Sequence, residues 1–201
     1  MGRAKAWLPF GDELLLPRIV RIACGVLDPV VVVAAPGQEL PPLPKAVEVV
    51  RDRLSGKGPL AGLAAGLAAL DGPCDAAYVS SCDVPFLTDA FVRRVIDSLG
   101  DAEIALPEIG GYPHALAGVY RLSVRPAVER MLSENRLRLR DLLAEVQTRR
   151  LAADGFSDVG LDSLTNVNTP VEYDAALKKI EETTNCTNPT NRKSQSTNDI
   201  L

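Results

Sequence analysis

The sequence has few cysteines, few aromatic residues and a single histidine, and these shortages exclude several kinds of site. Four cysteines and one histidine, His114, occur in 201 residues. No two cysteines form a Cys-x-x-Cys pair, so a structural zinc site with four clustered ligands is excluded. Aromatic residues make up 4% of the chain, too few for a platform that stacks the bases of a single-stranded nucleic acid.

Long hydrophobic runs and an excess of positive charge are also missing. No apolar run reaches the roughly 18 residues of a membrane-spanning helix. Lysine and arginine number 22 against 26 acidic residues, and the formal net charge of −4 indicates no basic surface for nucleic acid. The basic start of the chain is not followed by the apolar core of a signal peptide. We therefore expect a cytoplasmic protein with reduced cysteines that binds neither nucleic acid nor a membrane.

Short apolar segments alternate with helical patterns along most of the chain. The predicted strands are 30–35, 46–50, 76–81, 103–107 and 116–120, and the predicted helices are 13–24, 60–70, 88–99, 124–134, 139–146 and 170–183. This alternation predicts an α/β fold, with a doubly wound, mostly parallel Rossmann-like sheet and helices on both faces. The predicted domain covers residues 1–184, and the polar tail 185–201 is expected to be disordered.

Ligands of such sheets bind beyond the carboxyl ends of the strands, and two charged residues are candidates there. Lys5 precedes a predicted helix, where a cation suits a phosphate, although a solvated surface lysine is the alternative. Asp83 directly follows the strand 76–81 and could hold Mg²⁺ beside phosphates. The alternative for Asp83 is an ordinary turn cap.

Three further motifs carry polar groups or exposed backbone. Asp52 follows the strand 46–50 and leads to a glycine-rich turn at 56–62, whose backbone could approach a ligand or could merely be a turn. Asn166 and Asn168 flank one valine, so in an extended segment their amides share a side that suits a flat heterocycle, although a helix cap explains the motif too. His114 precedes a strand and is either structural or a substrate contact.

Taken in order, these motifs resemble the MobA-like nucleotidyltransferases. The resemblance runs from Met1 to about Leu177 and rests on the segments 1–11, 51–52, 58–62, 82–86, 114–121, 137–143 and 166–170. It implies a nucleotide-diphospho-sugar-transferase-like fold. It also implies a reaction in which molybdopterin cofactor attacks the α-phosphate of GTP, so that GMP is transferred and pyrophosphate leaves. The implied setting is molybdenum cofactor biosynthesis, with molybdoenzyme-assembly proteins as possible partners.

The same resemblance assigns roles to individual residues. Lys5 and Asp83 would be catalytic, Lys5 by neutralising phosphate charge and Asp83 by holding Mg²⁺. The nucleotide would be bound by Lys5, Asp52, Gly58, Pro59, Leu60 and Asp83. The pterin would be contacted by His114, Asn166 and Asn168. A transfer of this kind needs positioning and charge neutralisation and no protein nucleophile.

One segment of the family pattern is not found in this sequence. The family has a central strand and a Leu-Ala-Gly-Gly loop ahead of its lysine, whereas this sequence begins at Met1, just after their place. We therefore expect the strands at Val30 and Ala76 to flank a gap with unpaired backbone groups. A natural start upstream is the preferred interpretation. A related transferase that uses CTP or another acceptor, and an inactive binding homologue, are the alternatives.

Overall fold

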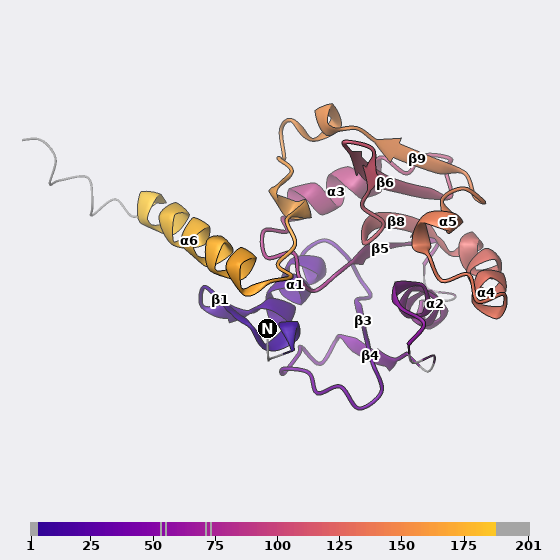
Figure 1. Ribbon diagram of the computed structural model, residues 1–201, viewed down its shortest axis with the longest axis horizontal. Coiled ribbons are helices and arrows are strands. Elements are labelled where there is room, and N and C mark those ends of the chain that lie inside the picture. Colours follow the sequence, from indigo (N-terminus) through magenta and orange to yellow (C-terminus); the bar gives the residue numbers. More distant parts are fainter. Residues whose placement is uncertain (1–3, 53, 55, 71, 73, 188–201) are drawn as a thin grey trace, which may run out of the picture.

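The computed structural model describes residues 4–52, 54, 56–70, 72 and 74–187, and its longest sheet is built from strands between Ala76 and Leu151. This sheet has the strand order β5-β8-β6, with β7 and β9 both paired to β6. The strands are β5 (Ala76–Ser80), β6 (Ile104–Ile109), β7 (Tyr112–Pro113), β8 (Ala117–Arg121) and β9 (Thr148–Leu151). A parallel pair, β3 (Val31–Ala34) and β4 (Glu48–Arg51), lies apart from it in Figure 1.

The expectation of a mostly parallel sheet is wrong for the middle of the long sheet. The predicted strand at 116–120 is β8, and it runs antiparallel to both β5 and β6. The reason is the connection from β6 to β8, which is too short to hold a crossover helix, so the chain must return antiparallel. Only β3 with β4, and β6 with β9, are parallel pairs in the described part of the chain.

Helices cover both faces of the sheet, as expected. On one face, α1 (Leu15–Cys24) and α3 (Asp89–Asp97) enclose a core with Ala105 and Val119. On the other face, α2 (Pro59–Ala69), α4 (Arg125–Ser133) and α5 (Leu139–Leu142) enclose a core with alternate residues of the same strands. No helix in the described ranges has both the length and the apolar character needed to cross a bilayer.

Several element boundaries differ from the sequence prediction. The helix predicted from residue 13 begins at Leu15, because Glu13–Leu14 (β2) pairs with Pro9–Phe10 (β1) in a small hairpin. Short 3-10 turns complete the fold: η1 (Lys5–Trp7), η2 (Leu122–Val124), η3 (Ala153–Phe156) and η4 (Asp162–Leu164). Thr88 caps α3 as predicted, since its hydroxyl accepts a hydrogen bond from the Phe91 amide at 3.2 Å.

The last helix, α6 (Pro170–Thr187), extends away from the body of the molecule in Figure 1. Near its beginning it packs against the N-terminal hairpin through Tyr173, Ala176, Leu177 and Ile180, a helical spacing. The helix runs to Thr187 and so extends three residues into the segment predicted to be a tail. The rest of that tail, 188–201, lies outside the described residues.

An apolar groove separates the two groups of strands. It has a volume of about 490 Å³ and is lined along its length by β3 on one side and β5 on the other. Helices α1 and α2 line it as well, α2 partly through Gly62 and Gly66. The Tyr78 hydroxyl is buried at this groove and has no hydrogen-bond partner in the part of the chain that the structure describes. The groove lies where the sequence placed a gap between the strands at Val30 and Ala76.

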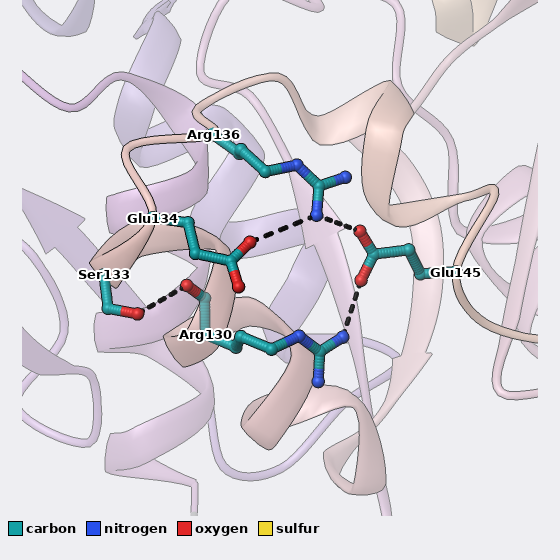
Figure 2. A network of polar contacts seen from close by, with 5 residues as sticks. All are labelled: Arg130, Ser133, Glu134, Arg136 and Glu145. Carbon is teal, nitrogen blue, oxygen red and sulfur yellow. Dashed lines mark hydrogen bonds and ion pairs between the residues drawn. The ribbon is translucent and has the colours of Figure 1, made fainter.

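A polar network fixes the turn that follows α4, and Figure 2 shows its five residues. The Glu145 carboxylate accepts hydrogen bonds from Arg130 at 2.6 Å and contacts Arg136 at 2.5 Å, while Glu134 lies 3.4 Å from Arg136. Arg130 and Arg136 hold the pKa of Glu145 below its usual range. The contact joins the end of the α5 region to α4, on the face of the sheet opposite α3.

Replacing Phe91 by alanine should destabilise the domain strongly. Phe91 is fully buried and stacks on Phe156 with ring centroids 5.1 Å apart, so the variant leaves a cavity and costs about 3–5 kcal/mol. Urea unfolding measures this change. The control is Val49→Ala on β4, which is 40% exposed and should stay within about 0.5 kcal/mol of the parent. Equal midpoints for the two variants would contradict this account of the core.

Candidate functional site

Three residues that are far apart in the sequence meet at one ammonium group. Lys5 Nζ lies 2.6 Å from Asp83 Oδ2 and also donates a hydrogen bond to Asn168 Oδ1 at 2.6 Å. The Asp83 side chain is 13% exposed and that of Lys5 is 31% exposed, so the ion pair is only partly open to solvent. Three residues predicted from separate motifs therefore form one cluster.

Each member of the cluster is held by the element that carries it. Lys5 begins η1, whose Ala6 is buried against Val32 and Val47. Asp83 follows β5, and its carbonyl accepts a hydrogen bond from the Val167 amide at 2.9 Å. Val167 is fully buried, whereas Asn166 and Asn168 on either side of it are exposed, which is the alternation that the motif predicts.

The oxygen donors of the cluster fit a hard divalent cation. Asp83 Oδ1 is buried and has no hydrogen-bond partner among the described residues, so this carboxylate keeps an oxygen available for a ligand. Mg²⁺ typically takes one or two carboxylates and completes its shell with water and substrate oxygens. Within the described ranges, no three His, Cys, Asp or Glu residues gather as a metal-binding group, so Asp83 would be the main protein ligand.

Cys82, next to Asp83, is not an activated nucleophile. Burial raises the pKa of its thiol, and the neighbouring Asp83 carboxylate raises it further. A thiol must be deprotonated to attack, so this environment opposes covalent catalysis by Cys82.

The predicted nucleotide loop lies on the other side of the groove from Asp83. Asp52 lines the groove, and its Oδ1 accepts a hydrogen bond from the Leu54 amide at 2.8 Å. Gly58 caps α2 with a φ of +67°, and nothing lies within 4 Å of where a side chain would begin. Pro59 occupies the first turn of α2, and the Leu60 side chain is fully buried in the core, which leaves only its backbone for a ligand.

His114 and Asn166 stand outside the lysine cluster. The His114 ring contacts Tyr112 edge-on with centroids 5.3 Å apart, and burial lowers the pKa of its imidazole. No contact joins His114 or Asn166 to Lys5 or Asp83 among the hydrogen bonds of the described residues. The structure thus brings together Lys5, Asp83 and Asn168, whereas His114 and Asn166 have no hydrogen bond to this cluster among the described residues.

Sequence reasoning missed Glu172, which fixes the asparagine motif. Its carboxylate accepts hydrogen bonds from the amides of Asn168 at 2.7 Å and Thr169 at 3.0 Å, while Thr169 Oγ1 accepts from the Glu172 amide. These backbone donors hold the pKa of Glu172 below its usual range, and the charge of Lys5 adds to the effect. The pattern Thr-x-x-Glu at 169–172 is a capping box and could have revealed it.

Comparison with known proteins decides the family. A family model described as a MobA-like NTP transferase domain matches residues 1–151. The chain belongs to this family. It is 37% identical over 187 residues to a protein of Mycobacterium tuberculosis strain H37Rv named "Probable molybdenum cofactor guanylyltransferase", and the match covers 89% of this chain and 87% of the relative. The MobA-like chain is therefore a nucleotidyltransferase.

Solved structures share the fold at lower identity. Molybdopterin-guanine dinucleotide biosynthesis protein A from Archaeoglobus fulgidus superimposes with a TM-score of 0.73 at 18% identity, covering 90% of this chain and 92% of that one. A Mycobacterium tuberculosis protein solved as a complex with manganese gives a TM-score of 0.61 at 19% identity, covering 88% and 93%. At such identities the likeness establishes an α/β nucleotidyltransferase-like fold for this MobA-like chain.

Replacing Glu172 by glutamine should lower the melting temperature at neutral pH and not in acid. The folded-state pKa of Glu172 is depressed, so its contribution is present above the ordinary carboxyl range and disappears as the pH falls through that range toward the folded pKa. Melting curves of both proteins at about pH 7 and about pH 3 test this. Glu181→Gln, on the same helix, is the control, and a pH-independent difference for Glu172→Gln would contradict the capping role.

Proposed function

We propose that this MobA-like enzyme transfers GMP from GTP to molybdopterin cofactor and releases pyrophosphate. The observation that carries the proposal is the meeting of Lys5, Asp83 and Asn168 at one ammonium group, at the edge where β5 ends. In the transfer, an oxygen of the acceptor's phosphate forms a bond to the α-phosphorus of GTP. The bond from that phosphorus to the bridging oxygen breaks, and its electron pair leaves with pyrophosphate.

The residues at the cluster suit the charges of this reaction. Lys5 places a cation where negative charge develops on the phosphate oxygens, which is the main form of assistance that such a transfer needs. Asp83 and Asn168 would hold a bound Mg²⁺, which supplies further charge neutralisation at the phosphates. The backbone of Asn168 is fixed by its hydrogen bond to Glu172, so the Asn168 side chain is positioned before substrate binds.

The nucleotide and the acceptor are proposed to bind on opposite sides of Asp83. Asp52, Gly58 and Pro59, with the Leu60 backbone, would bind the nucleotide at the beginning of α2, where open glycine positions allow close approach. His114, Asn166 and Asn168 would contact the pterin. The preference for GTP over CTP rests on the name of the mycobacterial relatives at 37% identity. The manganese bound by the structural neighbour supports a divalent metal in general.

Asp83→Asn should abolish most turnover and leave the fold intact. The variant removes the charge that holds Lys5 and the cation, so we expect a fall in kcat on the order of 10²–10³-fold. Purified protein is incubated with molybdopterin, Mg²⁺ and either GTP or CTP, and the dinucleotide product is measured. The control is Asp97→Asn at the exposed end of α3.

Each outcome of this assay bears on a different part of the proposal. Dinucleotide from GTP that depends on Asp83 and not on Asp97 supports it. A preference for CTP overturns the choice of base, and turnover that survives Asp83→Asn overturns the role of the cluster. Absence of product in every chain tested, including an N-terminally extended one, overturns the activity and favours a binding protein.

We also propose that the apolar groove seats a β-strand ahead of Lys5. The edges of β3 and β5 line the groove, and strand edges need hydrogen-bond partners. A strand there could also supply the partner that the Tyr78 hydroxyl lacks. Lys5 donates a hydrogen bond to Asp83, which follows β5 in the chain. The Trp7 indole donates a hydrogen bond to the carbonyl of Glu39, which follows β3. The segment 5–7 thus joins the carboxyl ends of both strands, where a parallel strand in the groove would also end.

An N-terminal extension that carries an apolar strand and a Gly-Gly turn should therefore stabilise the domain. We expect a higher urea midpoint and slower amide exchange in β3 and β5, because the new strand pairs both edges. The control is a Gly/Ser extension of equal length, which cannot fill an apolar groove. If both extended proteins unfold at the midpoint of the chain that starts at Met1, the groove does not seat a strand.

A further inference from the structure

An exposed aromatic ring stands on the hairpin formed by β6 and β7. Tyr112 is 68% exposed and is the one aromatic residue among the exposed large apolar residues of the described chain. Leaving so much ring surface in water forgoes the burial that usually stabilises such a side chain. A ring kept in the open beside a proposed site is therefore a candidate binding surface.

The hairpin presents this ring rigidly. Tyr112 pairs with Ile109 and Pro113 with Glu108, and the His114 amide donates to the Pro107 carbonyl at 2.8 Å. Gly110 and Gly111 both have positive φ, +59° and +79°, as the tight turn of a two-residue hairpin loop requires. An ion pair between Glu108 and Arg150 ties the hairpin to β9. Little conformational entropy would be lost when a ligand covers the ring.

The hairpin lies at the same edge of the sheet as Asp83. Because β8 is antiparallel to both β5 and β6, the last two run in the same direction and their carboxyl ends share an edge. Asp83 follows β5 and the hairpin follows β6. A backbone contact links the two regions, since the Ser81 amide donates to the Leu116 carbonyl at 3.3 Å.

The nucleotide and the acceptor are distinguished by the two sides of Asp83 on which their proposed binding residues lie. The proposed nucleotide residues, Asp52 and Gly58, follow β4 beyond the groove, on one side of Asp83. The hairpin lies on the other side of Asp83, beyond β8. A flat ring that reaches Tyr112 therefore belongs to the acceptor and not to the nucleotide.

We propose that Tyr112, with His114 against it, stacks on the pterin ring of the acceptor and determines the affinity for that substrate. This inference rests on the proposed function. The two rings meet at 78° with centroids 5.3 Å apart, an edge-to-face arrangement in which His114 supports the tyrosine ring. Stacking suits any flat heterocycle, and the hydrogen bonds that distinguish a pterin would come from the exposed amides of Asn166 and Asn168.

The test separates acceptor binding from nucleotide binding. Tyr112→Ala should raise the KM for molybdopterin on the order of tenfold, as expected for loss of one stacking contact, and should leave the KM for GTP and kcat unchanged. Tyr112→Phe keeps the ring and should behave like the parent. Val49→Ala, another exposed apolar position but on β4, is the matched control.

A second measurement works without turnover. Molybdopterin is titrated with protein in the absence of GTP, and quenching of pterin fluorescence reports stacking. Quenching by the parent and by Tyr112→Phe, but not by Tyr112→Ala, supports the inference. Equal acceptor KM values and equal quenching for the parent and Tyr112→Ala overturn it and leave the proposed transfer standing. A parent that quenches but makes no dinucleotide overturns the proposed transfer and leaves the stacking site standing.

Discussion

The geometry of the site depends on the single ammonium group of Lys5. It contacts Asp83 Oδ2 and Asn168 Oδ1, both at 2.6 Å, and so joins η1, the end of β5 and the beginning of α6. Asp83 is largely buried, and a buried carboxylate without its cation would be costly. The contact therefore favours one arrangement of three segments that lie more than 75 residues apart. It also leaves Asp83 Oδ1 without a partner among the described residues, and the proposed transfer would use this oxygen to hold a cation.

The apolar groove divides the site into two halves. Asp52 and Gly58 are attached to β4 and α2 on one side, whereas Asp83 and the Tyr112 hairpin are attached to the long sheet on the other. No strand pairing joins β3 to β5 in the described chain, so η1, α1 and α2 carry the connection. The groove therefore lies between the residues proposed to bind the nucleotide and those proposed to bind the acceptor.

Strong local signals predicted most elements, and the failures have physical causes. Thr88 before α3 and the valines of β3 identified their elements because capping and burial act locally. Apolar periodicity did not reveal the direction of β8, because that direction depends on the length of the connection from β6. It also did not reveal β9, because this edge strand contains two adjacent arginines. Motif order singled out Lys5, Asp83 and Asn168, whose side chains meet in the structure, and their roles stay predictions. The position of Tyr112 could not be predicted, since exposure on a hairpin leaves no hydrophobic pattern.

The protein groups around Asp83 leave the nucleophile to the substrate. Burial raises the pKa of the Cys82 thiol, and the Ser80 hydroxyl donates its hydrogen to the Ser81 carbonyl at 3.1 Å. His114 is held against Tyr112 rather than against either of these side chains, so no described residue pair forms an activated nucleophile with its base. In the proposed transfer, the attacking oxygen accordingly comes from the acceptor. If the proposed transfer holds, selectivity among acceptors would follow from contacts made away from the phosphates, on the Tyr112 hairpin and at the exposed amide of Asn166.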